Sequence, residues 1–179
     1  AANDVVRIRY FTARVKPRRG DPGQPVRQDF YLRALATIPH LRIIEGRYSE
    51  FPKRLPVTPR IPLFDAQGKP ARVAEVMRSE EKGSDVNLAS HLLVDGFQNH
   101  YDVAVVISAD TDLAEPIRLA RIALKKKVGI LSPYPRLSPH IKRHASFTKT
   151  ISEADLLASQ FPDQLHDARG TFHRPATWR

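Results

Sequence analysis

The chain has 179 residues, 41% of them hydrophobic, and 29 Lys and Arg against 19 Asp and Glu, which gives a formal net charge of +10. This length and composition predict a single globular domain over residues 1–179 and exclude a disordered chain. No apolar run approaches the roughly 20 residues that span a bilayer, so we expect no membrane contact. The sequence contains no cysteine, which excludes disulfides and thiolate metal sites and favours a cytoplasmic location. The positive charge favours RNA as a partner, and the sequence leaves open a homo-oligomer.

Taken in chain order, the first elements alternate between strand and helix. Residues 5–15 alternate apolar and polar side chains in part and are rich in β-branched and aromatic types, which predicts a strand. A turn-rich basic loop follows at 16–25. Apolar residues at near-helical spacing predict a helix over 26–38, which Pro39 ends. Residues 41–48 then predict a second strand.

A proline-rich basic loop is predicted at 49–70. This segment holds five prolines together with four Lys or Arg residues, and such a composition is typical of a surface loop or insertion. It has two interpretations, an arm that contacts the substrate or a variable surface loop, and the second is slightly favoured.

The second half of the chain continues the alternation. Residues 103–107 (VAVVI) form an unbroken apolar run, which is typical of a strand buried on both faces in a parallel sheet. The pattern as a whole predicts a doubly wound, mainly parallel α/β sheet. The other predicted elements are strands at 71–77, 128–131 and 149–151, helices at 84–97, 113–126, 137–145 and 153–161, and an irregular tail at 162–179.

Three aspartates are predicted to share the functional edge of this sheet. Ligands of such sheets bind at the carboxyl ends of the strands. The apolar strand at 103–107 runs directly into Asp110 and Asp112, and Asp85 lies in the first turn of the preceding helix. Clustered carboxylates repel one another unless a cation compensates. Hard oxygen ligands suit Mg²⁺ or Mn²⁺ rather than Zn²⁺, so these three residues are predicted metal ligands and catalytic residues.

Ordinary structural roles also exist for these side chains. Asp112 with Glu115 resembles a helix capping box, and Asp85 would favour the positive end of a helix. Each residue alone is more often structural, whereas the set on one sheet edge favours a site. Ser108 is predicted to add a hydroxyl contact, and Lys82 to offset charge or contact a phosphate.

The motif around these aspartates resembles the NYN domain family, a branch of the PIN-like nucleases. The segment EKGSDVNLA at 81–89 is followed by YD at 101–102 and by VAVVISADTDL at 103–113, in the family's order, spacing and helix–strand context. The resemblance extends over nearly the whole chain. Further similar segments are YLRAL at 31–35, VGIL at 128–131, and Arg174, Pro175 and Trp178 near the end.

The resemblance implies a Rossmann-like, PIN-like three-layer α/β/α sandwich. It also implies cleavage of RNA that depends on Mg²⁺ or Mn²⁺. The family's acidic pocket corresponds to Asp85, Asp110 and Asp112, and its supporting positions correspond to Asn87 and Ser108.

One departure from the family concerns its first strand. Family members begin with a hydrophobic strand that ends in an aspartate, whereas residues 5–15 resemble the family's second strand. We therefore expect the sequence to lack an N-terminal strand that would lie between 5–15 and 103–107. Direct pairing of those two strands would contradict this hypothesis.

The leading hypothesis is a metal-dependent RNA endonuclease domain. Metal-activated water would hydrolyse the phosphodiester bond, and no protein nucleophile is required. The alternative is a non-catalytic RNA-binding or regulatory module, which the incomplete acidic set and the positive charge favour. A third hypothesis, ranked last, is a small-molecule enzyme that uses the same acidic pocket with the proline-rich loop as a lid.

Overall fold

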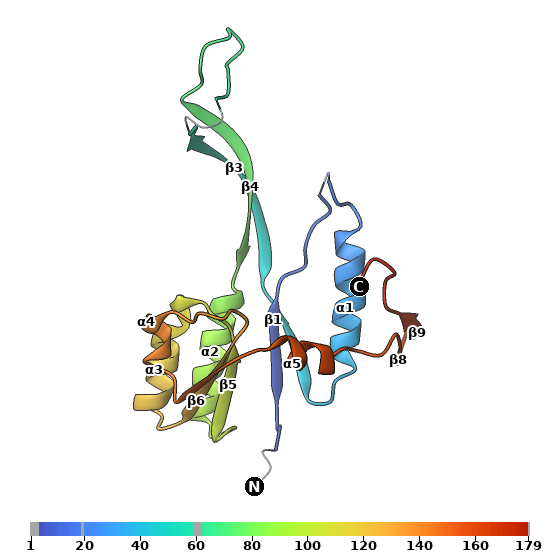
Figure 1. The fold of residues 1–179 in the computed structure, drawn as a ribbon, viewed down its shortest axis with the longest axis vertical. Coiled ribbons are helices and arrows are strands. Elements are labelled where there is room, and N and C mark those ends of the chain that lie inside the picture. Colours follow the sequence, from blue (N-terminus) through green and yellow to red (C-terminus); the bar gives the residue numbers. More distant parts are fainter. Residues whose placement is uncertain (1–3, 19, 59–61, 179) are drawn as a thin grey trace.

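The computed structural model describes residues 4–18, 20–58 and 62–178, and it has an α/β fold with parallel strands. The N-terminal part is a strand–helix–strand crossover in which β1 pairs in parallel with β2 (Figure 1). The crossover helix α1 carries a proline in its first turn, where a missing N–H costs nothing, and buries Leu32, Ala34 and Leu35. The bounds are Ile8–Thr12 for β1, Gln24–Ala36 for α1 and Leu41–Glu45 for β2.

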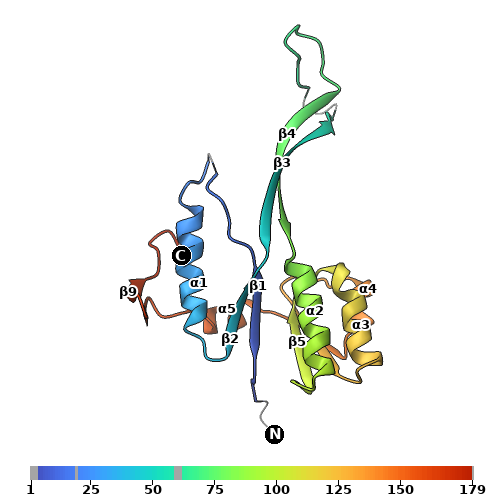
Figure 2. The same cartoon turned by 180° about the vertical axis from the view of Figure 1, so that it is seen from behind.

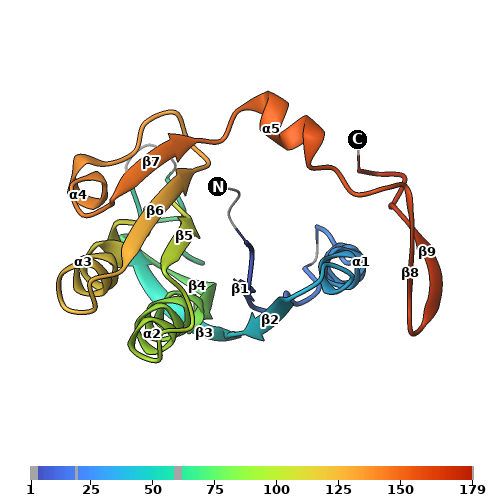
Figure 3. The same ribbon diagram turned by 90° about the horizontal axis from the view of Figure 1, so that it is seen from below.

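A second parallel sheet has the strand order β5-β6-β7. Two helices, α2 and α3, cover one of its faces (Figure 3). Leu92, Val106, Ile117, Val128 and Ile130 form the centre of the core between these layers. No helix in the described part of the chain is long and apolar enough to cross a membrane. The bounds are Ser84–Phe97 for α2, Val103–Ile107 for β5, Thr111–Leu113 for the short 3-10 helix η1, Ala114–Ile122 for α3, Lys127–Ser132 for β6, Pro139–Lys142 for α4, Phe147–Thr150 for β7 and Glu153–Ala158 for α5.

The two parallel sheets are separate. Among the described residues, β1 pairs only with β2 and β5 pairs only with β6. The α/β class is therefore confirmed, whereas the single three-layer sandwich predicted from the sequence is not observed. The sequence predicted a further strand between β1 and β5, which direct pairing of these two strands would contradict. They are not paired with each other among the described residues, so the further strand stays a prediction. The expectation that β5 is buried on both faces was wrong: Val103, Val105 and Ile107 are 44%, 49% and 64% exposed.

Helix α2 joins the two sheets through an ion-pair cluster around Asp95. Its carboxylate accepts hydrogen bonds from Arg7 at 2.9 Å and from two nitrogens of Arg9 at 2.8 Å each. Burial alone would raise the pKa of Asp95, but the hydrogen bonds from Arg9 and Arg7 outweigh this effect and lower the pKa to about 2. The cluster thus anchors the start of β1 to a helix that also packs on the core of the second sheet.

A long hairpin, β3–β4, projects from the body of the molecule (Figures 1 and 2). We call it the arm, formed by β3 (Arg47–Pro56), β4 (Val73–Lys82) and the described residues between them. The predicted loop at 49–70 was therefore wrong over its first part, and the predicted strand at 71–77 extends to Lys82. A two-stranded hairpin leaves one edge of each strand unpaired, which is where prolines such as Pro52 are tolerated. Pro59, Arg60 and Ile61 lie outside the described residues.

The C-terminal tail is also more ordered than predicted. Strands β8 (Gln164–Asp167) and β9 (Gly170–His173) pair antiparallel, so the expectation of an irregular tail at 162–179 was wrong for these residues. Asp167 accepts two hydrogen bonds from Arg33 of α1, at 2.7 and 2.8 Å. The Arg33 guanidinium also lies 4.1 Å from the centre of the buried Phe172 ring. These contacts, distant in sequence, hold the hairpin on α1.

Candidate functional site

The site lies where the arm joins the body. Strand β4 ends at Lys82, Gly83 turns the chain with a φ of 97°, and α2 starts at Ser84, so Asp85 stands in the first turn of the helix. Only a residue without Cβ adopts this φ freely. Asp110 and Asp112 follow the carboxyl end of β5. We call Glu81, Asp85, Asp110 and Asp112 the acidic edge.

The acidic edge is a zone of mutual repulsion. Partial removal of water from the Asp85 carboxylate raises its pKa most, and the negative charges of Asp110, Glu81 and Asp112 raise it further, in that order. The three aspartates named from the sequence therefore come within electrostatic reach of one another. All four side chains are exposed to solvent, so a cation or a proton has direct access to them.

Asp110 has a local structural role that the sequence assigned to Asp112. Its carboxylate accepts a hydrogen bond from the backbone N–H of Asp112 at 2.9 Å and caps η1. The backbone N–H of Asp110 in turn donates to the hydroxyl of Ser108 at 3.1 Å. The suggested capping box between Asp112 and Glu115 is not formed, because Glu115 instead pairs with Arg118 at 2.7 Å.

The oxygen donors of the acidic edge have the right chemistry for a hard divalent cation, but they do not form a complete site. Within residues 4–18, 20–58 and 62–178, no three His, Cys, Asp or Glu side chains come together closely enough to hold a metal ion. The predicted set of three ligands is thus brought to one edge without being assembled. One physical reason is that the carboxylate of Asp110 is engaged by its own turn, where it accepts the backbone N–H of Asp112.

The predicted supporting residues lie around the same edge. Lys82 is exposed and pairs with Glu80 at 2.6 Å, so it faces along the arm. Asn87 is partly buried one turn into α2, and Ser108 holds the Asp110 loop.

Sequence reasoning missed Glu81, which raises the pKa of Asp85 and accepts a hydrogen bond from the Ser84 hydroxyl. Its position four residues before Asp85, at the strand end inside the recognised motif, was the available signal.

The joint between arm and body depends on Gly46. A Cβ at this position would lie 2.5 Å from the Lys82 carbonyl oxygen and 3.2 Å from the Ser84 nitrogen. Because both are backbone atoms, we expect Gly46→Ala to displace the joint and cost about 1–3 kcal/mol of stability in urea unfolding. Gly20→Ala is the control, since its Cβ would meet nothing within 4 Å. Equal stability of the two variants would show that the joint adapts freely.

The sequence and the fold of this chain are similar to those of known proteins. The model of the NYN domain family matches residues 3–153. The chain is 28% identical, in an alignment 180 residues long, to 6-hydroxy-3-succinoylpyridine 3-monooxygenase HspA of Pseudomonas putida (strain DSM 28022 / S16). That alignment covers 96% of this chain but only 57% of the length of the relative. The fold is similar to the crystal structure of a protein of unknown function, VPA0982, from Vibrio parahaemolyticus RIMD 2210633, with a TM-score of 0.50 and 18% identity, covering 84% of this chain and 71% of that one.

Proposed function

The chain belongs to the NYN domain family, and from this premise we propose that it is an RNA endonuclease that depends on Mg²⁺ or Mn²⁺. The observation that supports this proposal most is that Asp85, at the start of α2, lies within electrostatic reach of Asp110 and Asp112. Asp110 and Asp112 follow the carboxyl end of the parallel strand β5, the edge where such sheets bind ligands. Carboxylates held in mutual repulsion favour the binding of a cation. The net charge of +10 supports a polyanionic substrate.

In this proposal the residues have distinct tasks. Asp85 and Asp110 would be the principal ligands of the metal ion, and Asp112 would be a further ligand or would orient the attacking water. A bound divalent cation would acidify water and stabilise negative charge on the phosphoryl group. Ser108 fixes the Asp110 loop through its hydrogen bond to the Asp110 N–H. Lys82, exposed beside the edge, would contact the phosphate backbone. The backbone N–H of Asn87 donates to the Gly83 carbonyl oxygen at 2.7 Å at the start of α2.

The decisive experiment is cleavage of labelled single-stranded RNA in Mn²⁺, in Mg²⁺ and in EDTA. We expect cutting with metal and none in EDTA, and Asp110→Asn to lower the rate by on the order of 100-fold or more. Asp102→Asn is the matched control, because Asp102 is an exposed aspartate just before the opposite end of β5. Cleavage that survives Asp110→Asn would refute the proposal.

A non-catalytic RNA-binding module is the alternative. It is favoured by the absence of a three-ligand group among the described residues. The module would bind RNA with an affinity that falls steeply with salt and would cut it in no metal. Binding without cleavage in the experiment above would select this function.

A second candidate comes from the relative of known name, which is described as a monooxygenase acting on a pyridine. Because the chain spans 57% of the length of that relative, the transfer of its activity to this chain is a separate proposal. Going by its name, the reaction would place one atom of O₂ on ring carbon 3 with departure of the succinoyl group that this carbon carries, and an external two-electron donor, which the assay must supply, would reduce the other atom to water. Oxygen consumption that requires 6-hydroxy-3-succinoylpyridine would support it.

A further inference from the structure

The arm has two chemically different faces. Residues directly opposite each other in an antiparallel pair project on the same side of the ribbon, and sides alternate along each strand. The pairing Arg47↔Lys82 therefore sets one face, and the next pair, Tyr48↔Glu81, sets the other. The faces of the whole hairpin follow from this register.

Basic residues collect on one face. The basic face carries Arg47, Lys53, Arg78 and Lys82, with Glu80 as its single acidic residue and Phe51 in its middle. The opposite face carries Glu50, Glu75 and Glu81, with Arg54 as its single basic residue. The sign of the charge therefore reverses across the ribbon, although Lys53 and Arg54 are neighbours in sequence.

Side-chain contacts agree with this division. Glu80 lies between two basic neighbours of its own face, 2.5 Å from Arg78 and 2.6 Å from Lys82. Arg54 lies 3.8 Å from Glu75, its cross-strand neighbour on the opposite face. Within the part of the chain that the structure describes, no carboxylate pairs with Arg47 or Lys53. The basic face thus keeps a surplus of uncompensated positive charge.

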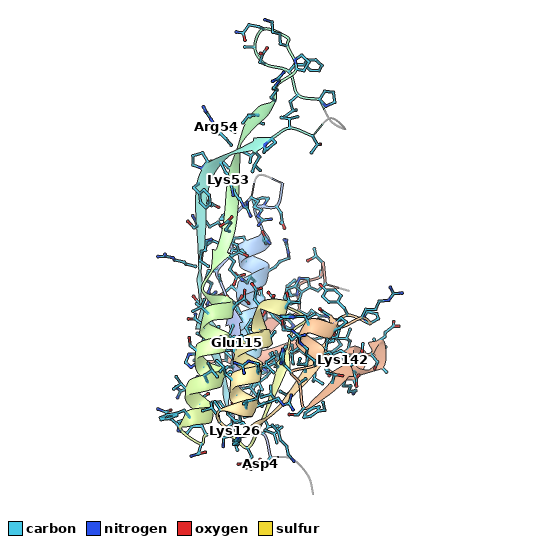
Figure 4. All side chains as sticks on the ribbon, turned by 90° about the vertical axis from the view of Figure 1, so that its left-hand side faces the viewer. Asp4, Lys53, Arg54, Glu115, Lys126 and Lys142 are labelled. Carbon is cyan, nitrogen blue, oxygen red and sulfur yellow. The ribbon has the colours of Figure 1, made fainter. Side chains whose placement is uncertain are left out.

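The basic face begins beside the candidate site, on the side of the ribbon opposite to Glu81, and leads away from the site. Arg47 and Lys82 line a shallow hollow at the base of the arm together with Glu45, Gly46, Gly83 and Val86. Asp85 neighbours Val86 in the first turn of α2. Lys53 lies farther out on the arm, in the half of the molecule opposite Lys126 (Figure 4). Phe51 lies between them, half-buried. A row of cations interrupted by an aromatic ring is the pattern that single-stranded nucleic acids bind, through phosphates and base stacking.

We propose that the basic face of the arm holds single-stranded RNA and delivers it to the acidic edge. Arg47, Lys53, Arg78 and Lys82 contact phosphates, and the ring of Phe51 stacks on a base. This inference rests on the proposed function, because it identifies the surface on which the substrate of that same site lies.

The test is binding of labelled single-stranded poly(U) RNA in EDTA, measured by fluorescence anisotropy as a function of salt. We expect Lys53→Glu to weaken binding by about threefold to tenfold at low salt and to lower the slope of log affinity against log salt by about 1. Arg54→Glu is the matched control: it makes the same charge change one residue away, on the opposite face, and we expect little effect. Phe51→Leu is expected to weaken binding by about tenfold with an unchanged salt slope.

Equal losses for Lys53→Glu and Arg54→Glu would overturn the proposal, because only net charge would then matter. It would also be overturned if Lys53→Glu left RNA binding intact but reduced self-association in sedimentation, since the arm would then pair with a second copy. Omitting metal keeps this test apart from the nuclease proposal. An inactive protein that still shows the Lys53–Arg54 difference would preserve the binding face and refute only cleavage.

Discussion

Replacing Asp85 with Asn is expected to abolish metal-dependent RNA cleavage while leaving the protein at least as stable as before. Loss of a principal metal ligand should lower the rate by on the order of 100-fold or more. Stability should not fall, because Asn removes a charge that Asp110, Glu81 and Asp112 repel. RNA cleavage and thermal unfolding, measured on the same preparation, test both parts of the prediction.

The gain in stability from Asp85→Asn should depend on pH. The pKa of Asp85 in the folded chain is raised above its ordinary value of 3.8. The folded state therefore favours the protonated form, and the charged form reduces stability once the pH rises through the folded pKa. The gain from Asp85→Asn should appear at neutral pH and disappear below about pH 4.

A purely structural Asp85 predicts the opposite result. A carboxylate that only stabilises the start of α2 would make Asp85→Asn less stable, by about 1–3 °C in melting temperature. Added Mn²⁺ distinguishes the two roles further: it should raise the melting temperature of the parent protein and have little effect on Asp85→Asn. A destabilised variant that still responds to Mn²⁺ would remove Asp85 from the proposed site.

The largest effect on stability is expected from Asp95→Asn. This change leaves Arg7 and Arg9 without the carboxylate that neutralises them, at a site where the Asp95 side chain is only 11% exposed. Removal of one partner from a buried ion pair typically costs 3–5 kcal/mol, and the partial exposure of Arg7 reduces the expected loss here to about 2–4 kcal/mol. Urea unfolding monitored by circular dichroism measures this loss.

Asp29→Asn is the matched control for this prediction. Asp29 also lies between two arginines, Arg14 at 3.1 Å and Arg169 at 3.4 Å, but its side chain is 39% exposed. Exposed pairs contribute at most about 1 kcal/mol, so a small effect is expected. Comparable losses at Asp29 and Asp95 would mean that burial is not the cause.

Lowering the pH should reproduce the loss of folding stability that Asp95→Asn causes. Its pKa is lowered to about 2 from an ordinary value of 3.8. The stabilisation is therefore present above about pH 4 and is lost as the pH falls toward 2. The Asp95→Asn variant should lack this part of the acid transition.

The elements with strong local signals were predicted best. The helix expected at 84–97 and the strand expected at 103–107 have those bounds in the structure, because helical periodicity and an unbroken apolar run are both properties of short segments. The arm was missed for the opposite reason. Its strands pair residues as far apart as Arg47 and Lys82, and its prolines favoured a loop when each strand was considered alone.

The site shows the same limit. Sequence order placed Asp85, Asp110 and Asp112 at one edge, and the structure brings their charges together there. Side-chain directions were less predictable: the capping carboxylate is that of Asp110 rather than Asp112. The ring of His91 in α2 lies 5.8 Å from the Phe11 ring of β1, a contact that the sequence does not indicate. Such contacts depend on how α2 packs against a strand far away in the sequence.

That packing has a consequence for cooperativity. Helix α2 contacts β1 and β2 on one side and shares the core of β5 and β6 on the other, whereas the two sheets share no hydrogen-bonded strands among the described residues. Each sheet is therefore a unit that can open without first breaking the ladder of the other. The aspartates after β5 and the base of the arm that follows β2 belong to different units, and α2, which carries Asp85, is the element that couples them. We therefore expect changes in α2, more than changes in either sheet, to alter how Asp85 lies relative to Asp110 and Asp112.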